Sequence, residues 1–221
     1  MHLLIVTVDW KTPRGSLRFG QCTRYLSRLT PGTKVTVSIK PSVMKLPPLD
    51  TQPIIMAGLG TGAAPFRAFL QARAHQRSLG KEVGPLYYYF GSRHQAKEYL
   101  YGEELEAYLS DGLLTHLGLA FSRDQQKKVY IQHKIKEDGH MLTSFLAPEL
   151  GSVNDQSEEA AEALVDEGRK GIFTLCGPVW PVPDIQEALV SAFVERGWTK
   201  EQAEAKIESL KDDERYVLEV Y

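Results

Sequence analysis

From residue 51 onward, short apolar segments alternate with longer segments in which apolar residues recur every three or four positions. The short segments predict buried strands at residues 54–57, 86–90, 117–121 and 172–176, and a last strand at 216–221. The longer segments predict helices at residues 65–79, 98–109, 140–146, 157–168 and 185–193. Thr199 and Gln202 form a capping-box pattern, which predicts one more helix. Because strands that alternate with helices are typical of a parallel sheet, we expect a doubly wound α/β domain.

Residues 1–50 show a different pattern, in which turn residues separate short β-branched segments. The sequence predicts strands at 3–9 and 34–40 and a short helix at 21–29. The consecutive prolines Pro47-Pro48 then predict a stiff connector, because proline is unfavourable in helices and in central strands. We therefore predict two domains, residues 1–50 and residues 51–221.

The composition argues against several classes of function. The formal net charge is −2, which does not suggest a broad basic surface for nucleic acid. No apolar run approaches the roughly 20 residues that cross a bilayer, and the apolar start of the chain lacks the features of a signal peptide. The two cysteines lie far apart in the sequence, so we expect no disulfide scaffold, no metal site and a reducing, cytoplasmic location.

A glycine-rich segment, Gly58-Leu59-Gly60-Thr61-Gly62-Ala63-Ala64-Pro65, follows the strand predicted at 54–57. Glycines allow turns with positive φ and let an anion approach the backbone, and helix N-termini favour negative charge. Pro65 suits the first turn of the helix that follows. The order of strand, glycine turn and helix predicts a pyrophosphate site; a purely structural tight turn is the alternative.

Two later strands are each followed by a serine and an arginine, in Gly91-Ser92-Arg93 and in Ser122-Arg123. Ligands of open α/β sheets bind at the carboxyl ends of the strands, and arginine binds phosphate through paired donors. The second loop contains further polar residues, namely Lys127, Lys128, Tyr130 and Gln132. The pattern predicts a dinucleotide with an extra 2′-phosphate, which is NADP rather than NAD. A solvated basic loop that includes Asp124 is the alternative.

The last residues of the two final predicted strands, Cys176 and Tyr221, have two interpretations each. Cys176, which precedes Gly177 at the end of a strand, is either a small buried residue or a neighbour of the nicotinamide. Tyr221, the last residue, is either a frayed terminus or a ring that stacks on a planar cofactor.

These motifs, taken in order, resemble the diflavin reductases, which are relatives of ferredoxin–NADP reductase. The resemblance rests on Gly60–Arg67, Tyr99-Leu100-Tyr101, Ser122-Arg123, Lys128–Gln132, Cys176-Gly177 and the aromatic last residue. Within the family, the segments Lys40–Pro48 and Cys176–Asp184 look most like those of the fungal assimilatory sulfite reductase flavoproteins. The resemblance implies an NADP-binding domain preceded by the C-terminal part of an antiparallel FAD-binding β-barrel.

The resemblance implies a role for each matching residue. The residues expected at the NADP pyrophosphate are Gly60, Thr61, Gly62 and Pro65. Those expected at the adenosine half are Ser122, Arg123, Lys128, Tyr130 and Gln132, with the first three nearest the 2′-phosphate. Cys176 is expected beside the nicotinamide, Tyr221 over the flavin ring, and Glu219 where the family has an aspartate. The segment expected at the FAD pyrophosphate is Gly20-Gln21-Cys22-Thr23.

An Arg-x-Tyr-Ser segment that grips FAD in the family has no match here. We therefore expect a complete NADP domain, an incomplete FAD domain, and a missing upstream segment. The function implied is hydride transfer from NADPH to FAD, with onward transfer through an FMN- or haem-bearing partner to sulfite reductase. A reductase that serves P450-like haemoproteins and a non-catalytic NADP-binding module are the alternatives. Nucleic-acid binding through Arg24, Arg28 and Lys34 has little support.

Overall fold

The computed structural model describes residues 2–148 and 167–221. Most of the helix predicted at 157–168 lies outside these residues. The chain forms two compact units, Met1–Ser42 (unit 1) and Val43–Tyr221 (unit 2), and each is described by itself.

Unit 1 contains a short hairpin and one helix. Strands β1 (Asp9–Lys11) and β2 (Leu17–Phe19) pair antiparallel, and α1 (Gln21–Leu26) follows them. The strand predicted at 34–40 is wrong, and of the one predicted at 3–9 only the last residue is in a strand. The β-branched side chains at 35, 37 and 39 are exposed, so alternation alone did not give this segment a hydrogen-bonded neighbour.

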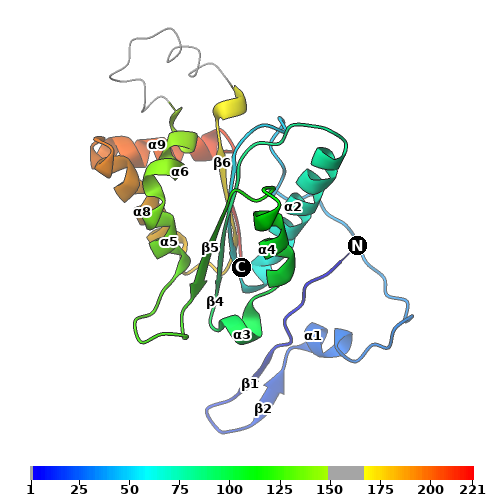
Figure 1. The fold of residues 1–221 in the computed structure, drawn as a ribbon. Helices are drawn as coiled ribbons and strands as arrows, with labels where there is room; N and C mark the ends of the chain where they lie inside the picture. The colour runs from blue at the N-terminus through cyan, green and yellow to red at the C-terminus, as the bar shows by residue number, and fades with distance from the viewer. Residues whose placement is uncertain (1, 149–166) are drawn as a thin grey trace. The chain divides into compact units, whose positions relative to one another are not determined.

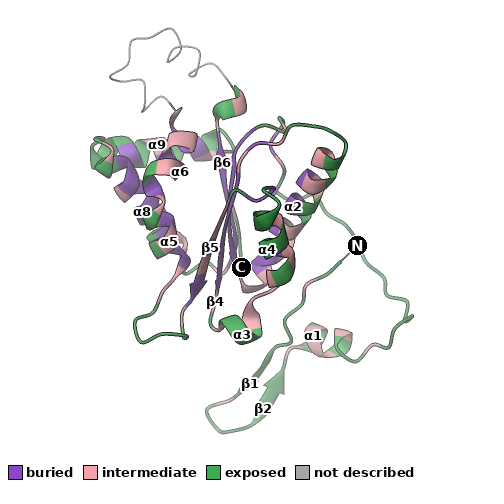
Figure 2. Ribbon diagram, in the orientation of Figure 1, coloured by how far each residue is buried: buried purple, intermediate pink, exposed green. Residues whose placement is uncertain are grey.

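Unit 2 is built on a parallel sheet with the strand order β5-β4-β3-β6-β7. Its strands are β3 (Ile54–Leu59), β4 (Leu86–Ser92), β5 (His116–Phe121), β6 (Ile172–Gly177) and β7 (Tyr216–Val220). All five strands were predicted, because parallel strands are buried on both faces and read as continuous apolar runs. The strands β3, β4 and β6 are almost wholly buried, whereas β5 and β7 are buried only in part; Figure 2 shows β4 and β6 largely in the colour of buried residues.

Helices cover both faces of the sheet (Figure 1). On one face lie α2 (Ala63–Ser78) and α4 (Gly102–Ser110); on the other lie α5 (Ile131–Glu137), α6 (Gly139–Leu146), α8 (Val182–Glu195) and α9 (Lys200–Asp212). The predicted doubly wound α/β fold is confirmed for unit 2. In the part of the chain that the structure describes, no helix combines the length and the apolar composition that a membrane span requires.

Two helical predictions need correction. The helix predicted at 98–109 is two helices, α3 (Gln95–Glu98) and α4, because Tyr101 adopts a left-handed backbone with φ 60°. The seven-residue α5 was not predicted, since its few apolar positions give little periodicity. The capping box at Thr199 is confirmed: Gln202 N donates to Thr199 Oγ1 at 3.2 Å, and Thr199 N donates to Gln202 Oε1 at 2.8 Å.

The proline-rich connector is fixed to α2 by a buried arginine. Arg73 is fully buried, and its Nη1 donates to Asp50 Oδ1 at 2.6 Å while its Nη2 donates to Leu49 O at 3.2 Å. Asp50 is partly exposed, but its removal would leave the buried guanidinium of Arg73 without this charged partner, which is unfavourable. The connector thereby holds α2, which begins directly after the glycine turn, in a defined place.

Candidate functional site

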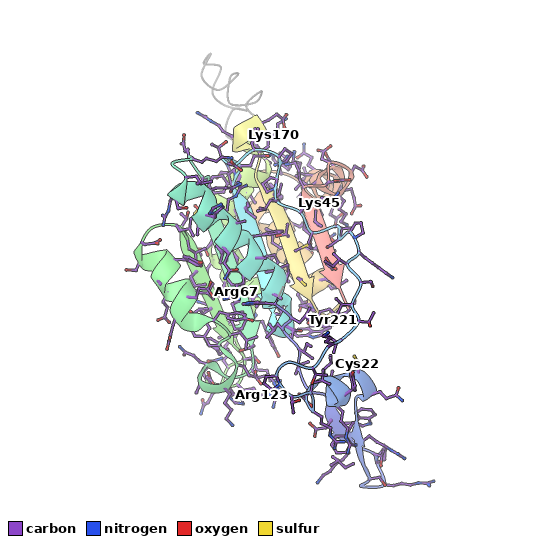
Figure 3. The ribbon with its side chains drawn as sticks, turned by 90° about the vertical axis from the view of Figure 1, so that its right-hand side faces the viewer. Cys22, Lys45, Arg67, Arg123, Lys170 and Tyr221 are labelled. Atoms are coloured by element: carbon purple, nitrogen blue, oxygen red, sulfur yellow. The ribbon has the colours of Figure 1, made fainter. Side chains whose placement is uncertain are left out.

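Four loops of unit 2 and its last residue lie at one edge of the sheet. Because all five strands are parallel, their carboxyl ends share this edge, where ligands of open α/β sheets bind. The residues that follow or end the strands there are Gly60, Ser92, Ser122, Cys176 and Tyr221. Figure 3 shows Arg123 and Tyr221 at this end of unit 2, whereas Lys45 and Lys170 lie at the opposite end.

The glycine turn η1 (Gly60–Gly62) packs its backbone directly against the end of β6. A Cβ atom on Gly62 would lie 2.0 Å from Cys176 O, so no larger residue fits there without a backbone shift. Gly60 has φ +55°, and a Cβ atom on it would meet no atom within 4 Å. The turn is therefore closed on the side of Gly62 and open at Gly60, a shape that lets an anion approach the backbone.

The loops that follow β4 and β5 are hydrogen-bonded to each other. Ser122 N donates to Ser92 O at 3.0 Å, and Arg123 N donates to Arg93 O at 2.9 Å. The two serine–arginine pairs, which lie 30 residues apart in the chain, are thus neighbours.

Asp124 connects the same two loops through its side chain. Its Oδ2 accepts from Gln95 N at 2.7 Å, and its Oδ1 lies 2.9 Å from His94 Nδ1. The Gln95 N–H and then the His94 side chain lower the pKa of Asp124. The carboxylate of Asp124, which follows Arg123, is therefore hydrogen-bonded within these loops.

The two predicted phosphate-binding arginines are in different situations. Arg93 makes a two-pronged contact with Glu98, at 2.6 Å from Nη2 and 2.9 Å from Nε. Burial opposes ionisation of Glu98, but the hydrogen bonds from Arg93 outweigh it and lower the pKa of the carboxyl. Arg123 and Lys128 have no acidic partner among residues 2–148 and 167–221. Glu98 thus already pairs with Arg93, and the predicted contact of Arg93 with a phosphate stays a prediction.

Tyr130 and Gln132 lie at the beginning of α5. The Tyr130 ring meets the Trp180 ring edge to face, with centroids 5.7 Å apart and an interplanar angle of 73°. Gln132 Nε2 donates to Asp184 Oδ2 at 3.1 Å, and its buried Oε1 has no hydrogen-bond partner among the described residues. The ring contact joins the loop after β5 to the loop after β6, and the hydrogen bond joins the helices α5 and α8 that follow them.

Cys176, Glu219 and Tyr221 come together at the ends of β6 and β7. Cys176 is opposite Glu219 in the register of the two strands. Burial, and then the negative charge of Glu219, raise the pKa of the Cys176 thiol to about 11. Cys176 is only 8% exposed and is therefore a buried neutral thiol at neutral pH, which agrees with both predicted interpretations.

Tyr221 is 67% exposed but held at both ends. Its backbone N donates to Gly177 O at 3.1 Å, its O accepts from Val179 N at 3.2 Å, and its hydroxyl lies 2.7 Å from Thr61 Oγ1. The structure therefore does not show Tyr221 as a frayed terminus. Sequence reasoning missed the contact to Thr61, and it also missed Trp180, whose only signal was its place in the motif after Cys176.

The segment expected at the FAD pyrophosphate lies in unit 1. Gly20 precedes α1, and Gln21, Cys22 and Thr23 form its first turn. Thr23 Oγ1 accepts from Val8 N at 3.2 Å, so its hydroxyl fixes the approach to the hairpin. A groove of about 660 Å³ adjoins α1 and is lined by Leu17, Arg18, Phe19, Gln21, Arg24, Tyr25, Arg28 and Leu29.

Comparison with known protein families agrees with this geometry. The sequence profile described as the oxidoreductase NAD-binding domain matches residues 56–180, more than half of the chain. The chain belongs to this family. The matched residues include the glycine turn, both serine–arginine loops and Cys176.

The chain is also similar over its whole length to reductase components. It is 48% identical to the NADPH sulfite reductase flavoprotein component of Saccharomyces cerevisiae and 47% identical to the probable counterpart of Schizosaccharomyces pombe. It is 34% identical to the NADPH–cytochrome P450 reductase of Musca domestica. The predicted resemblance to sulfite reductase flavoproteins is confirmed. The chain spans 20% of the length of each yeast relative and 31% of that of the fly relative.

Proposed function

We propose that unit 2 binds NADPH and that the chain is the NADPH-binding part of a sulfite reductase flavoprotein. The observation that carries the proposal is the combination, at one sheet edge, of an open glycine turn with two cationic side chains, Arg123 and Lys128, that have no acidic partner in the described part of the chain. The similarity to the yeast flavoprotein components supports this reading.

The residues present suit the phosphates of NADPH. The backbone around Gly60 is open to a pyrophosphate, and Thr61 adds a hydroxyl at the same turn. Pro65 lies in the first turn of α2 and removes one backbone N–H that would need a partner. Arg123, Lys128 and Ser122 are proposed to hold the 2′-phosphate, because guanidinium and ammonium groups form strong charge-assisted hydrogen bonds with phosphate oxygens.

Arg93 has a supporting role in this proposal. Its ion pair with Glu98 shapes the loop after β4, and its carbonyl accepts from Arg123 N. Gly91 lets Ile131 pack closely against the same strand end, since a Cβ atom on it would lie 2.7 Å from Ile131 Cγ2. Ser92 Oγ is buried, and within the described residues no group forms a hydrogen bond with it.

At the other end of the site, Cys176, Gly177, Glu219 and Tyr221 are proposed to surround the reacting rings. A neutral thiol contacts a planar ring without introducing a charge, and burial, together with the charge of Glu219, raises the pKa of Cys176 further above neutral pH. Tyr221 has an exposed ring suited to covering a second planar ring. When bound, the nicotinamide supplies a hydride and FAD accepts it, so the contribution of the protein is orientation and electrostatics.

The proposal includes FAD and a partner. Gly20, Gln21, Cys22 and Thr23, beside a groove with three arginines, are proposed to contact the FAD pyrophosphate. An FMN- or haem-bearing component is proposed to receive the electrons for sulfite reduction in a reducing, cytoplasmic setting. Both cysteines of the chain are unpaired, which agrees with that setting.

A P450-type haemoprotein acceptor is the second candidate, since the fly relative is similar over the whole chain. Identity of 48% to the yeast flavoprotein component against 34% to the P450 reductase favours the sulfite pathway. The electron donor is the same in both cases.

Visible absorption of the chain tests the proposal. The chain is mixed with FAD, separated from the excess and then treated with NADPH without oxygen. Retained flavin bands that bleach on addition of NADPH support a functional reductase module. A protein that binds neither FAD nor NADP⁺ contradicts the proposal, and one that binds NADP⁺ alone restricts it to nucleotide binding.

A further inference from the structure

Trp180 is a large apolar side chain presented at the candidate site with 57% of its surface exposed. Its neighbour Val179 is 56% exposed, and Tyr221, whose carbonyl accepts from Val179 N, is 67% exposed. Single exposed apolar residues are normal on protein surfaces, but a group of them at a binding edge of the sheet marks a place for a ligand. Trp180 has no role in the function proposed above.

The loop that presents Trp180 is rigid. Gly177 O accepts from Tyr221 N at 3.1 Å, and Val179 O accepts from Val182 N at 3.1 Å. Pro178 and Pro181 restrict the backbone on either side of the indole. A ring held in one place loses little conformational entropy when a ligand binds to it.

Trp180 also contacts the segment that carries Arg123 and Lys128. Its ring meets that of Tyr130 at 5.7 Å, and Tyr130 follows Lys128 by two residues. Gln132 at the start of α5 donates to Asp184 at the start of α8, so the helices that follow the two loops are joined as well. The indole is therefore placed at the end of the loop from which Arg123 and Lys128 come.

We infer that Trp180 is a binding residue for the adenine ring of NADPH, which stacks on the exposed indole face. This inference rests on the proposed function. In NADPH the adenine and the 2′-phosphate are attached to the same ribose, so a ring that contacts Tyr130, at the end of the loop that carries Arg123 and Lys128, is suitably placed for the base. Aromatic side chains stack on bases through their π-faces, and an alanine substitution at such a contact typically weakens binding about tenfold or more.

Adenosine 2′,5′-bisphosphate is the appropriate probe, because it contains the adenine and the 2′-phosphate and lacks the nicotinamide. For the 221-residue chain, Trp180→Ala is expected to raise the calorimetric Kd about tenfold, whereas Trp180→Phe keeps it within about threefold. Trp10→Ala is the matched control, since Trp10 is 50% exposed but lies in unit 1, and it leaves Kd unchanged. An unchanged Kd in Trp180→Ala overturns the inference.

Tryptophan fluorescence gives a second readout that a merely structural role would not produce. Titration with adenosine 2′,5′-bisphosphate is expected to quench the emission of the wild type and of Trp10→Phe, and not that of Trp180→Phe. Quenching that persists in Trp180→Phe overturns the inference even if Trp180→Ala fails to fold. If the wild type does not bind the probe at all, the proposed NADPH site itself fails, which is a different outcome from binding without a contribution of Trp180.

Discussion

The hydroxyl oxygens of Thr61 and Tyr221 lie 2.7 Å apart, although 160 positions separate the two residues in the chain. The contact joins the glycine turn after β3 to the residue after β7. Thr61 is also proposed to meet the NADPH pyrophosphate, and Tyr221 is proposed to cover the flavin ring. The hydroxyl of Thr61 therefore bonds either to the Tyr221 hydroxyl or to the bound nucleotide.

Tyr221→Phe removes the hydroxyl of this pair and retains the ring. We expect NADP⁺ to bind a few-fold more tightly, because the Thr61 hydroxyl is then free for phosphate. Since both groups are accessible to solvent, the free energy of unfolding should fall by no more than about 1 kcal/mol. Calorimetric titration and urea denaturation measure the two quantities. Thr61→Val is the control: it also breaks the pair but should weaken NADP⁺ binding, and equal effects of both variants would contradict the account.

Arg123→Ala tests the 2′-phosphate assignment. A hydrogen bond to a charged group contributes about 1.5–3 kcal/mol, so the Kd for NADP⁺ should rise roughly ten- to hundredfold. The Kd for NAD⁺, which lacks this phosphate, should change less than about threefold. Competitive titration with both dinucleotides measures the ratio.

Arg93→Ala is the matched comparison for this arginine. Arg93 is neutralised by Glu98, so its loss should reduce the selectivity for NADP⁺ less than the loss of Arg123 does. If Arg93→Ala destroys the selectivity and Arg123→Ala does not, the roles given to the two residues are exchanged.

Alanine substitutions of Gly60 and Gly62, two glycines of the same turn, should have different effects on stability and on NADP⁺ binding. Gly62→Ala places a Cβ atom 2.0 Å from a backbone oxygen, so we expect a loss of stability of about 3 kcal/mol or more. Gly60→Ala has open space around the new atom, and it should cost about 1–2 kcal/mol through its positive φ while strongly weakening NADP⁺ binding. Urea denaturation and NADP⁺ titration of both variants separate the two effects; the reverse pattern would refute the assignment of the open side.

Cys176 should resist thiol reagents in the folded chain, whereas the exposed Cys22 should react. With a pKa of about 11, only about one thousandth of the Cys176 thiol is ionised at pH 8, and burial slows the reaction further. We expect one fast and one slow thiol with iodoacetamide at pH 8, and two fast thiols in denaturant. Two fast thiols in the native protein would show that Cys176 is accessible.

The same pKa shift makes the stability of the fold depend on pH. The folded state binds the Cys176 proton more tightly than the unfolded state does, so this contribution is complete below the usual thiol pKa and is lost as the pH rises toward about 11. Glu219→Gln should lower the pKa of Cys176 and reduce this loss. Thermal unfolding between pH 8 and 10.5 measures the difference, and identical pH profiles would show that Glu219 does not act on the thiol.

The sheet and the phosphate turn could be predicted from the sequence because both have local signals. Parallel strands such as Ile54–Leu59 are buried on both faces, and a strand followed by glycines and a helix has few other uses. The pairing of Arg93 with Glu98 has no such signal, since it depends on the short helix α3, of which only the last residue fell in a predicted helix. The contacts of Tyr221 with Thr61 and of Trp180 with Tyr130 depend on the order of the strands, which a single sequence does not encode locally.

In unit 1, the sequence signal was misleading for a related reason. The alternation at residues 34–40 has the period of a strand, but a strand forms only where a neighbour accepts its hydrogen bonds. The hairpin that does form, Asp9–Lys11 with Leu17–Phe19, is held by a tight turn at Gly15, whose φ is +82°.

Calorimetric titration of the 221-residue chain with NADP⁺ and NAD⁺, side by side at one salt concentration, tests the central claim most directly. The account predicts one saturable site for NADP⁺, with a Kd at least about tenfold lower than that for NAD⁺, because only NADP⁺ engages Arg123 and Lys128. Equal affinities, or no saturable binding of either dinucleotide, would contradict the claim that this sheet edge is an NADPH site.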